Sequence, residues 1–214
     1  MGKKTINLFV HGSSEGFNSE LIQFLYKELK KVGKDCYGFD FEYIKNKAKP
    51  SDNNVEEIKE LRKIISAFEK KGYQQINLIG KSMGGIISLH KDIISDPKIN
   101  KIIILGFPVK LGYPIDLKLL ARKPFIPKLN YRNEYIKHLN KINHLSSKIA
   151  IVQGLKDLLG SKEDIDNINS DLKNKLHIKY LDNAMHGFYP LTEETNKENN
   201  FKKVLSLVNK WTLS

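Results

Sequence analysis

The pentapeptide Gly-Lys-Ser-Met-Gly at residues 80–84 constrains the fold more than any other feature of the chain. It follows an apolar run at 76–79 and precedes a helical pattern at 85–90. A strand that turns sharply into a helix at a serine lifts the side chain above the end of a sheet, and flanking glycines let the two backbones approach closely. The pattern therefore favours a reactive Ser82. An ordinary glycine- and serine-rich turn between two core elements is the alternative.

Short apolar runs alternate with helical patterns along much of the chain. Such alternation predicts an α/β fold, in which a mostly parallel, doubly wound sheet is flanked by helices on both faces. Ligands bind at the carboxyl ends of the strands in a sheet of this kind, and Ser82 follows such an end. The predicted strands are 5–10, 35–41, 75–79, 101–105, 148–152 and 176–181, and the predicted helices are 19–31, 55–70, 84–95, 162–174 and 200–211.

One long segment, 109–145, interrupts the alternation. It is much longer than the roughly 4–6 residues of a usual connection, and its dense apolar residues suit a helical cap that folds over a site, with one helix near 133–141. It carries eight basic residues and only two acidic ones. The 214 residues, 40% of them hydrophobic, otherwise predict a single domain over 1–214 that contains this cap insertion.

The formal net charge of +12 and the pI near 9.5 would raise affinity for nucleic acid, anionic membranes or acidic ligands. Only Arg62, Arg122 and Arg132 are arginines among the 36 basic residues, and lysine, asparagine and isoleucine are abundant. This bias favours a solvated lysine surface over a dedicated polyanion site, although two of the three arginines lie in the predicted cap.

The cysteine count and the apolar runs of the sequence indicate the cellular compartment of the protein. Cys36 is the single cysteine, so neither an intramolecular disulfide nor a cysteine metal cluster can form. The apolar run at 6–10 is too short for the core of a signal peptide, and no run approaches the roughly 18 residues of a membrane span. We therefore expect a cytoplasmic protein in which Cys36 packs as a small apolar residue.

A serine hydroxyl is a poor nucleophile unless a base, oriented by an acid, takes its proton. Asp157 follows the predicted strand 148–152, and His186 follows the predicted strand 176–181. Asp157 alone could cap a helix, and His186 alone could be an ordinary loop histidine, but both come after strand ends, as Ser82 does. The other candidates fall in a predicted helix, strand or cap and are less well placed: Asp164, Asp166, His90, His138, His144 and His177.

An acyl-transfer site also needs backbone N–H groups that stabilise an oxyanion. Met83, which follows the serine, can supply one. The second is expected from the loop that starts at His11, where Gly12 permits unusual backbone angles and the amide of Ser13 is the first choice. His11 would then orient this loop. An ordinary turn stabilised by serine hydroxyls is the alternative.

At these residues the chain resembles the α/β-hydrolase superfamily, specifically small dienelactone-hydrolase-like and predicted serine hydrolases with a His-Gly loop and a Gly-x-Ser-Met-Gly-Gly elbow. The resemblance covers nearly the whole chain. It implies Ser82 as nucleophile, Asp157 as acid and His186 as base, with oxyanion contacts from Met83 and residues 11–14. Lys81 stands where many members have histidine, and the cap carries no assigned motif, so no substrate is implied.

We therefore expect a serine hydrolase that cleaves a carboxylic ester or thioester without a metal or organic cofactor. The basic, apolar cap suggests a substrate with an acyl chain and an anionic portion. The candidate substrate-binding residues are His11, Phe107, Arg122 and Phe125.

Two alternatives stay open. One is a peptidase or carbon–carbon bond hydrolase on the same scaffold. The other is a non-catalytic binding module whose basic surface holds an anionic partner, although all three catalytic residue types are present. We expect no specific nucleic-acid partner, and peripheral contact with a membrane is compatible with the charge.

Overall fold

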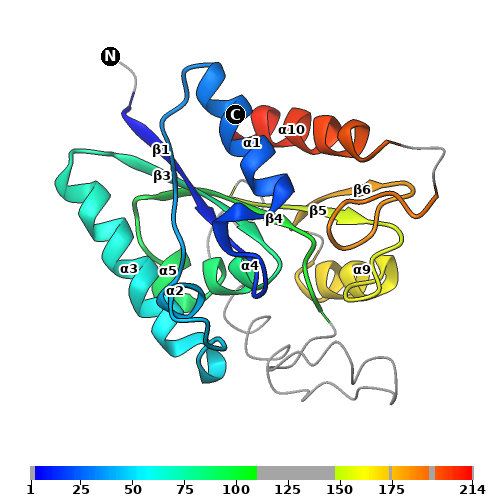
Figure 1. Cartoon of the computed structure of the whole chain (residues 1–214), viewed down its shortest axis with the longest axis horizontal. Helices are drawn as coiled ribbons and strands as arrows, with labels where there is room; N and C mark the ends of the chain where they lie inside the picture. The colour runs from blue at the N-terminus through cyan, green and yellow to red at the C-terminus, as the bar shows by residue number, and fades with distance from the viewer. Residues whose placement is uncertain (1–2, 110–147, 174, 193–195, 214) are drawn as a thin grey trace.

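A six-stranded sheet forms the centre of the protein in the computed structural model, which describes residues 3–109, 148–173, 175–192 and 196–213 (Figure 1). The strand order is β2-β1-β3-β4-β5-β6, and every pair of neighbours in the described chain is parallel. All carboxyl ends of the strands therefore lie at one edge. The strands are β1 (Thr5–Val10), β2 (Cys36–Gly38), β3 (Gln75–Lys81), β4 (Ile99–Leu105), β5 (Ile149–Gly154) and β6 (His177–Leu181).

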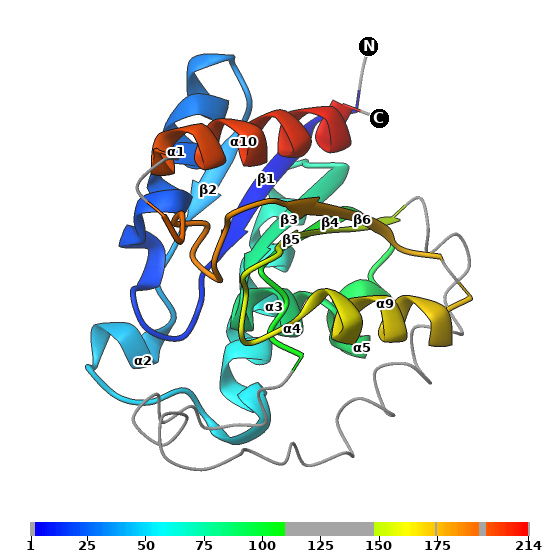
Figure 2. The same cartoon turned by 90° about the vertical axis from the view of Figure 1, so that its right-hand side faces the viewer.

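Helices cover both faces of the sheet (Figures 1 and 2). Helices α1 (Glu20–Lys31) and α10 (Lys197–Leu213) lie on one face, and the remaining described α-helices lie toward the other side. These are α2 (Glu42–Lys45), α3 (Val55–Lys70), α4 (Met83–Ser88), α5 (Lys91–Ile94) and α9 (Lys162–Asp171), and the chain also forms two 3₁₀ turns, η1 (Gly16–Asn18) and η2 (Asp52–Asn54). The predicted doubly wound α/β fold is confirmed.

The core has two parts, one on each face of the sheet. Successive side chains of a strand point to opposite faces, so Leu8 packs in the cluster that contains Leu61 of α3, and its neighbour Phe9 packs in the cluster that contains Leu25 of α1. Leu8, Phe9, Leu25 and Leu61 have no exposed surface. Burial on both faces explains why the central strands read as continuous apolar runs in the sequence.

Two predicted elements differ most from the structure, and the other differences are shifts of one to three residues at the ends of elements. Strand β2 stops at Gly38, before the predicted end at residue 41, because the chain turns away and the Phe41 N–H donates to the ring of His11. The helix predicted at 84–95 is two short helices, α4 and α5. His90 has non-helical backbone angles and accepts the Asp92 N–H through its ring, so it starts a new helix.

The predicted cap at 109–145, with its helix at 133–141, lies outside the described residues except for Val109. Within the described ranges, none of the helices is both long enough and apolar enough to cross a membrane.

Candidate active site

Ser82 lies at the sharp turn between β3 and α4. Its backbone angles are φ 52° and ψ −116°, a conformation that is sparsely populated for residues other than glycine. The neighbouring structure holds this turn, because the Ser82 N–H donates to the Leu105 carbonyl at 3.0 Å and the Ser82 carbonyl accepts the Gly85 N–H at 2.9 Å. The serine is therefore placed at the carboxyl edge of the sheet, as its motif predicts.

The two glycines of the motif are required by close backbone contacts. A Cβ atom on Gly84 would lie 2.0 Å from the Val10 carbonyl oxygen, and a Cβ on Gly80 would lie 2.7 Å from the backbone of Gly84. Real Cβ atoms do not approach backbone this closely. Glycine at both positions lets α4 start directly against β1 and β3.

The structure brings Ser82, Asp157 and His186 together from three different strand ends. His186 Nε2 lies 2.9 Å from Ser82 Oγ, and His186 Nδ1 lies 2.8 Å from Asp157 Oδ2. Because an ionised carboxylate only accepts hydrogen bonds, this arrangement assigns the ring proton to Nδ1 and leaves the Nε2 lone pair facing the serine hydroxyl. The histidine is thus oriented to take the proton of Ser82.

Buried contacts fix the loop that carries His186. Phe188 has no exposed surface, and its N–H donates to the Met185 carbonyl at 2.8 Å. Asn200 of α10 is also fully buried and donates through Nδ2 to the Phe188 carbonyl at 3.1 Å. Helix α10 therefore holds this loop in place from outside the sheet.

Asp157 is almost completely buried, with 2% of its surface exposed. Its Oδ1 accepts the Leu159 N–H at 2.8 Å, and its Oδ2 accepts both His186 Nδ1 and Nε2 of Gln153, the latter at 2.7 Å. Gln153 was not among the predicted site residues. The signal that could have revealed it is a polar residue that directly follows the apolar run 149–152 in β5. The competing acids Asp164 and Asp166 lie in α9, as predicted.

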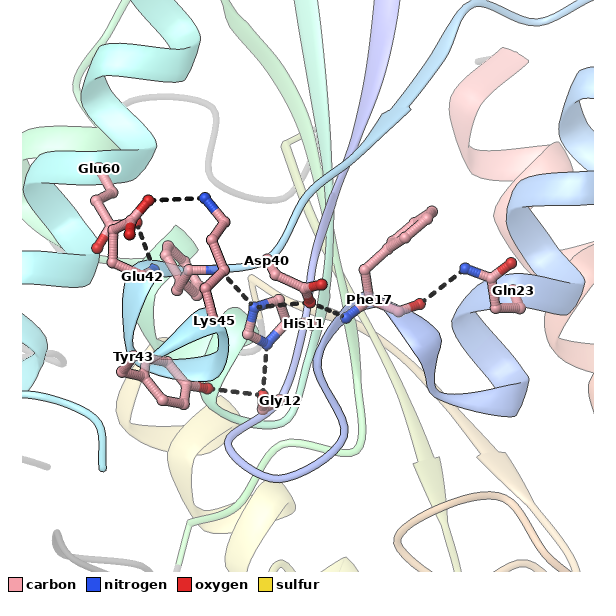
Figure 3. Close-up of polar contacts among 10 residues, drawn as sticks. His11, Gly12, Phe17, Gln23, Asp40, Glu42, Tyr43, Lys45 and Glu60 are labelled. Carbon is pink, nitrogen blue, oxygen red and sulfur yellow. Dashed lines mark hydrogen bonds and ion pairs between the residues drawn. The ribbon is translucent and has the colours of Figure 1, made fainter. Parts of the chain in front are cut away.

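The predicted oxyanion loop lies directly beside the serine. A Cβ atom built on Gly12 would be 3.4 Å from Ser82 Cβ. The Gly12 carbonyl accepts the Tyr43 hydroxyl at 3.1 Å and faces His11 Nδ1 at 2.6 Å (Figure 3). In a trans peptide the carbonyl and the following N–H point in opposite directions. The Ser13 N–H is therefore directed away from His11 and Tyr43.

His11 is fully buried and holds this loop through hydrogen bonds of its ring. Its Nε2 accepts the Phe41 N–H at 3.0 Å, so the ring proton lies on Nδ1 and is donated to the Gly12 carbonyl. Burial lowers the pKa of His11, although the Gly12 carbonyl and the carboxylates of Asp40 and Glu57 partly oppose this effect. The neutral ring therefore suits its environment.

The expectation that His11 contacts substrate is corrected by this burial, because the ring has no exposed surface and both its nitrogens are engaged by backbone groups. The loop-orienting role fits the geometry. Phe107 packs in the core with 8% of its surface exposed, so its contact with substrate stays a prediction. Arg122 and Phe125 lie outside the described residues.

Comparisons with known proteins agree on one architecture. The sequence profile of a family described as an alpha/beta hydrolase domain matches residues 3–116. An alpha/beta serine hydrolase without a lid from Xanthomonas campestris is similar with a TM-score of 0.66 and 15% identity over 98% of this chain and 84% of that one. The esterase domain of a Rhodothermus marinus protein has a TM-score of 0.65 and 18% identity over 96% and 84%.

Est1E from Butyrivibrio proteoclasticus, in a structure with ferulic acid bound, has a TM-score of 0.62 and 15% identity, and the match covers 99% of this chain and 91% of that one. No curated protein matches the chain. At these identities the structural similarity establishes a shared fold.

Proposed function

Because the chain belongs to the alpha/beta hydrolase family, we propose that it is a serine hydrolase that cleaves a carboxylic ester or thioester through an acyl-enzyme on Ser82. The family and the fold support hydrolase activity in general. The observation that carries the more specific proposal is the pair of hydrogen-bond contacts that links Ser82 Oγ to His186 at 2.9 Å and His186 to Asp157 at 2.8 Å.

The first half of the proposed reaction acylates the serine. Ser82 Oγ attacks the carbonyl carbon of the substrate while its proton passes to His186 Nε2. Asp157 accepts the hydrogen bond from the Nδ1–H group of His186 and stabilises the positive charge that develops on the ring. The tetrahedral intermediate then collapses, and His186 gives the proton to the leaving alcohol or thiol, so that the acyl group stays on Ser82.

The second half releases the acid. A water molecule takes the place of the leaving group and gives a proton to His186 as its oxygen attacks the acyl carbon. Collapse of the second intermediate returns this proton to Ser82 Oγ and frees the carboxylic acid. One ester or thioester bond and one water are consumed in each cycle.

The Met83 and Ser13 N–H groups are the proposed oxyanion donors in both halves. Met83 is the first residue of α4, so its N–H has no carbonyl partner within that helix. The fixed Gly12 carbonyl turns the Ser13 N–H away from His11 and Tyr43. Loss of one such donor costs about 100- to 1,000-fold in rate in serine proteases.

The substrate class is proposed from two features. One of the similar structures is described as an esterase domain, and another, Est1E, holds ferulic acid, an aromatic carboxylic acid. The basic residues of 109–145 favour, within this class, a substrate with an anionic portion. Paired neutral and anionic substrates therefore belong in the first activity assay.

Hydrolysis of aryl esters and acyl thioesters tests the proposal. We expect turnover by the wild type and a loss of at least about 1,000-fold in Ser82→Ala, because loss of the nucleophile removes the covalent route. Ser95→Ala is the matched control, since Ser95 is an exposed serine at the end of α5, and it should keep full activity. A folded wild type that hydrolyses none of these substrates, or equal rates in wild type and Ser82→Ala, would overturn the proposal.

A further inference from the structure

We propose that Gln153 is a positioning residue for this site: its buried amide holds the Asp157 carboxylate in the orientation that His186 requires. The inference rests on the proposed function, because it assigns Gln153 a part in activating Ser82. It goes beyond Ser82, Asp157 and His186, the three residues that the sequence predicts for the site.

Gln153 is unusual in its strand because it is polar and has no exposed surface. It lies near the carboxyl end of β5, and both ends of its amide are engaged. Oε1 accepts the Phe107 N–H at 2.7 Å, while Nε2 donates to Asp157 Oδ2 and to the Gly160 carbonyl, each at 2.7 Å. These partners fix the amide orientation, since a flipped amide would set an N–H group against the Phe107 N–H and an oxygen against two acceptors.

The contact with Asp157 has a direct consequence for its carboxylate. The Leu159 N–H holds Oδ1, and Gln153 holds Oδ2, the same oxygen that faces His186. A donor on each oxygen fixes the carboxylate plane. Burial of a carboxylate is also costly unless its oxygens accept hydrogen bonds. Without Gln153, Oδ2 would lose one of its two partners and the histidine would lose a fixed acceptor.

A purely structural role is the competing explanation, because Gln153 also satisfies the Phe107 and Gly160 backbones. Two variants separate the two roles. Gln153→Met has similar length and no hydrogen-bond donor. Gln153→Glu keeps an acceptor for the Phe107 N–H, and its acid form can donate to Asp157. Both variants lose the amide donation to Gly160, and only Gln153→Met also loses the acceptor for the Phe107 N–H. A purely structural role therefore predicts that any loss of labelling follows the loss in unfolding temperature of each variant.

The measurement is the rate of fluorophosphonate labelling of Ser82 as a function of pH, with thermal unfolding of each variant. Relative to wild type, we expect Gln153→Met to label about 10- to 100-fold more slowly at every pH, the range given by loss of a hydrogen bond to a charged group. Gln153→Glu should label at close to the wild-type rate at low pH, and its rate relative to the wild type should fall progressively as pH rises. Burial and the facing Asp157 carboxylate raise the pKa of the introduced carboxyl, which stops donating once it ionises.

Asn77→Ala is the matched control. Asn77 is a buried amide in β3 that hydrogen-bonds to Asn7 and Asn100, each at 3.0 Å, and neither of these partners belongs to the site. The substitution should lower the unfolding temperature and leave the labelling rate unchanged. Wild-type rates in both Gln153 variants, or slow labelling of Gln153→Glu with the pH profile of the wild type, would overturn the inference.

Failure of the proposed function gives a different result, namely no labelling of the folded wild type. A second readout then still tests the position of Asp157. The proton on His186 Nδ1 that faces a carboxylate should give a downfield proton NMR signal in the wild type. We expect this signal to broaden or vanish in Gln153→Met and to persist in Asn77→Ala, and an unchanged signal in Gln153→Met would contradict the positioning role. Should Gln153→Met fail to fold, Gln153→Glu at low and high pH gives the same comparison within one protein.

Discussion

At the scale of single residues, the candidate site contains the proposed reacting side chains and other residues whose hydrogen bonds hold them in position. Ser82 keeps a strained backbone conformation, of a kind that costs about 1–3 kcal/mol, because Leu105 and Gly85 bond to its backbone. Gln153 holds Asp157, and His11 holds Gly12. Substitutions of the holding residues should therefore alter the site without removing any reacting atom.

His11 provides a pH test at this scale. Burial lowers its pKa in the folded protein, whereas the unfolded chain should titrate near the usual value of about 6.5. Between these two values the unfolded state binds more protons than the folded state, so the free energy of unfolding rises with pH there. The contribution of His11 is therefore complete above about pH 6.5 and is lost as pH falls through the lower pKa of the folded state.

His11→Asn isolates this contribution, because the asparagine amide can still donate to Gly12 but does not titrate. We expect the variant to be less stable at neutral pH by about 1–3 kcal/mol, since the Phe41 N–H loses its buried acceptor. Its stability should fall less steeply on acidification than that of the wild type. Urea unfolding from pH 5 to 8 measures both slopes. His90 also has a lowered pKa and contributes equally to both proteins, so equal slopes would contradict the assignment.

Some site residues could be predicted from the sequence and others could not, for a physical reason. Ser82, Asp157 and His186 each directly follow a strand, and that position is visible in a local pattern. Gln153 contacts Asp157, but its amide is oriented by the Phe107 N–H, 46 residues away in the chain. The Gly12 carbonyl is likewise held by Tyr43, which is 31 residues away. Contacts of this kind depend on which strands are neighbours, which local patterns do not contain.

At the scale of elements, the turn from β3 into α4 determines the position of the serine. Gly84→Ala should destabilise the protein by several kcal/mol or prevent folding, because its Cβ would lie 2.0 Å from the Val10 carbonyl oxygen and neither backbone can move without displacing Ser82.

Gly33→Ala is the matched control in a urea unfolding experiment. Gly33 has a φ of 76°, and a methyl group added there would have no atom of the described residues within 4 Å. Only the backbone conformation should therefore cost stability, about 1 kcal/mol. Equal stabilities for Gly84→Ala and Gly33→Ala would mean that α4 does not pack against β1 as described.

The elements themselves were predicted best where one apolar face is continuous. Helix α3 has the predicted bounds of 55 and 70, and apolar residues recur along its buried side. The break between α4 and α5 was not predicted because apolar residues at helical spacing lie on both sides of it, whereas the break depends on the hydrogen bond from the Asp92 N–H to the ring of His90. The early end of β2 likewise depends on Phe41 bonding to His11, a contact across 30 residues.

At the scale of the whole molecule, strand order assembles the site. The strands that precede Ser82, Asp157 and His186 are β3, β5 and β6. They belong to the run of parallel neighbours β3-β4-β5-β6 in the strand order. Their carboxyl ends therefore meet at one edge. The sequence predicted the strands and their parallel arrangement, but the order β3-β4-β5-β6 comes from the structure.

Covalent labelling of Ser82 tests the central claim most directly. Intact-mass analysis after incubation with a fluorophosphonate should reveal one adduct on the wild type, none on Ser82→Ala, and much slower formation on His186→Ala, because the histidine is placed to take the serine proton. This result would establish an activated serine. A folded wild type without an adduct, or equal labelling of wild type and Ser82→Ala, would contradict the account and favour a binding module on the same fold.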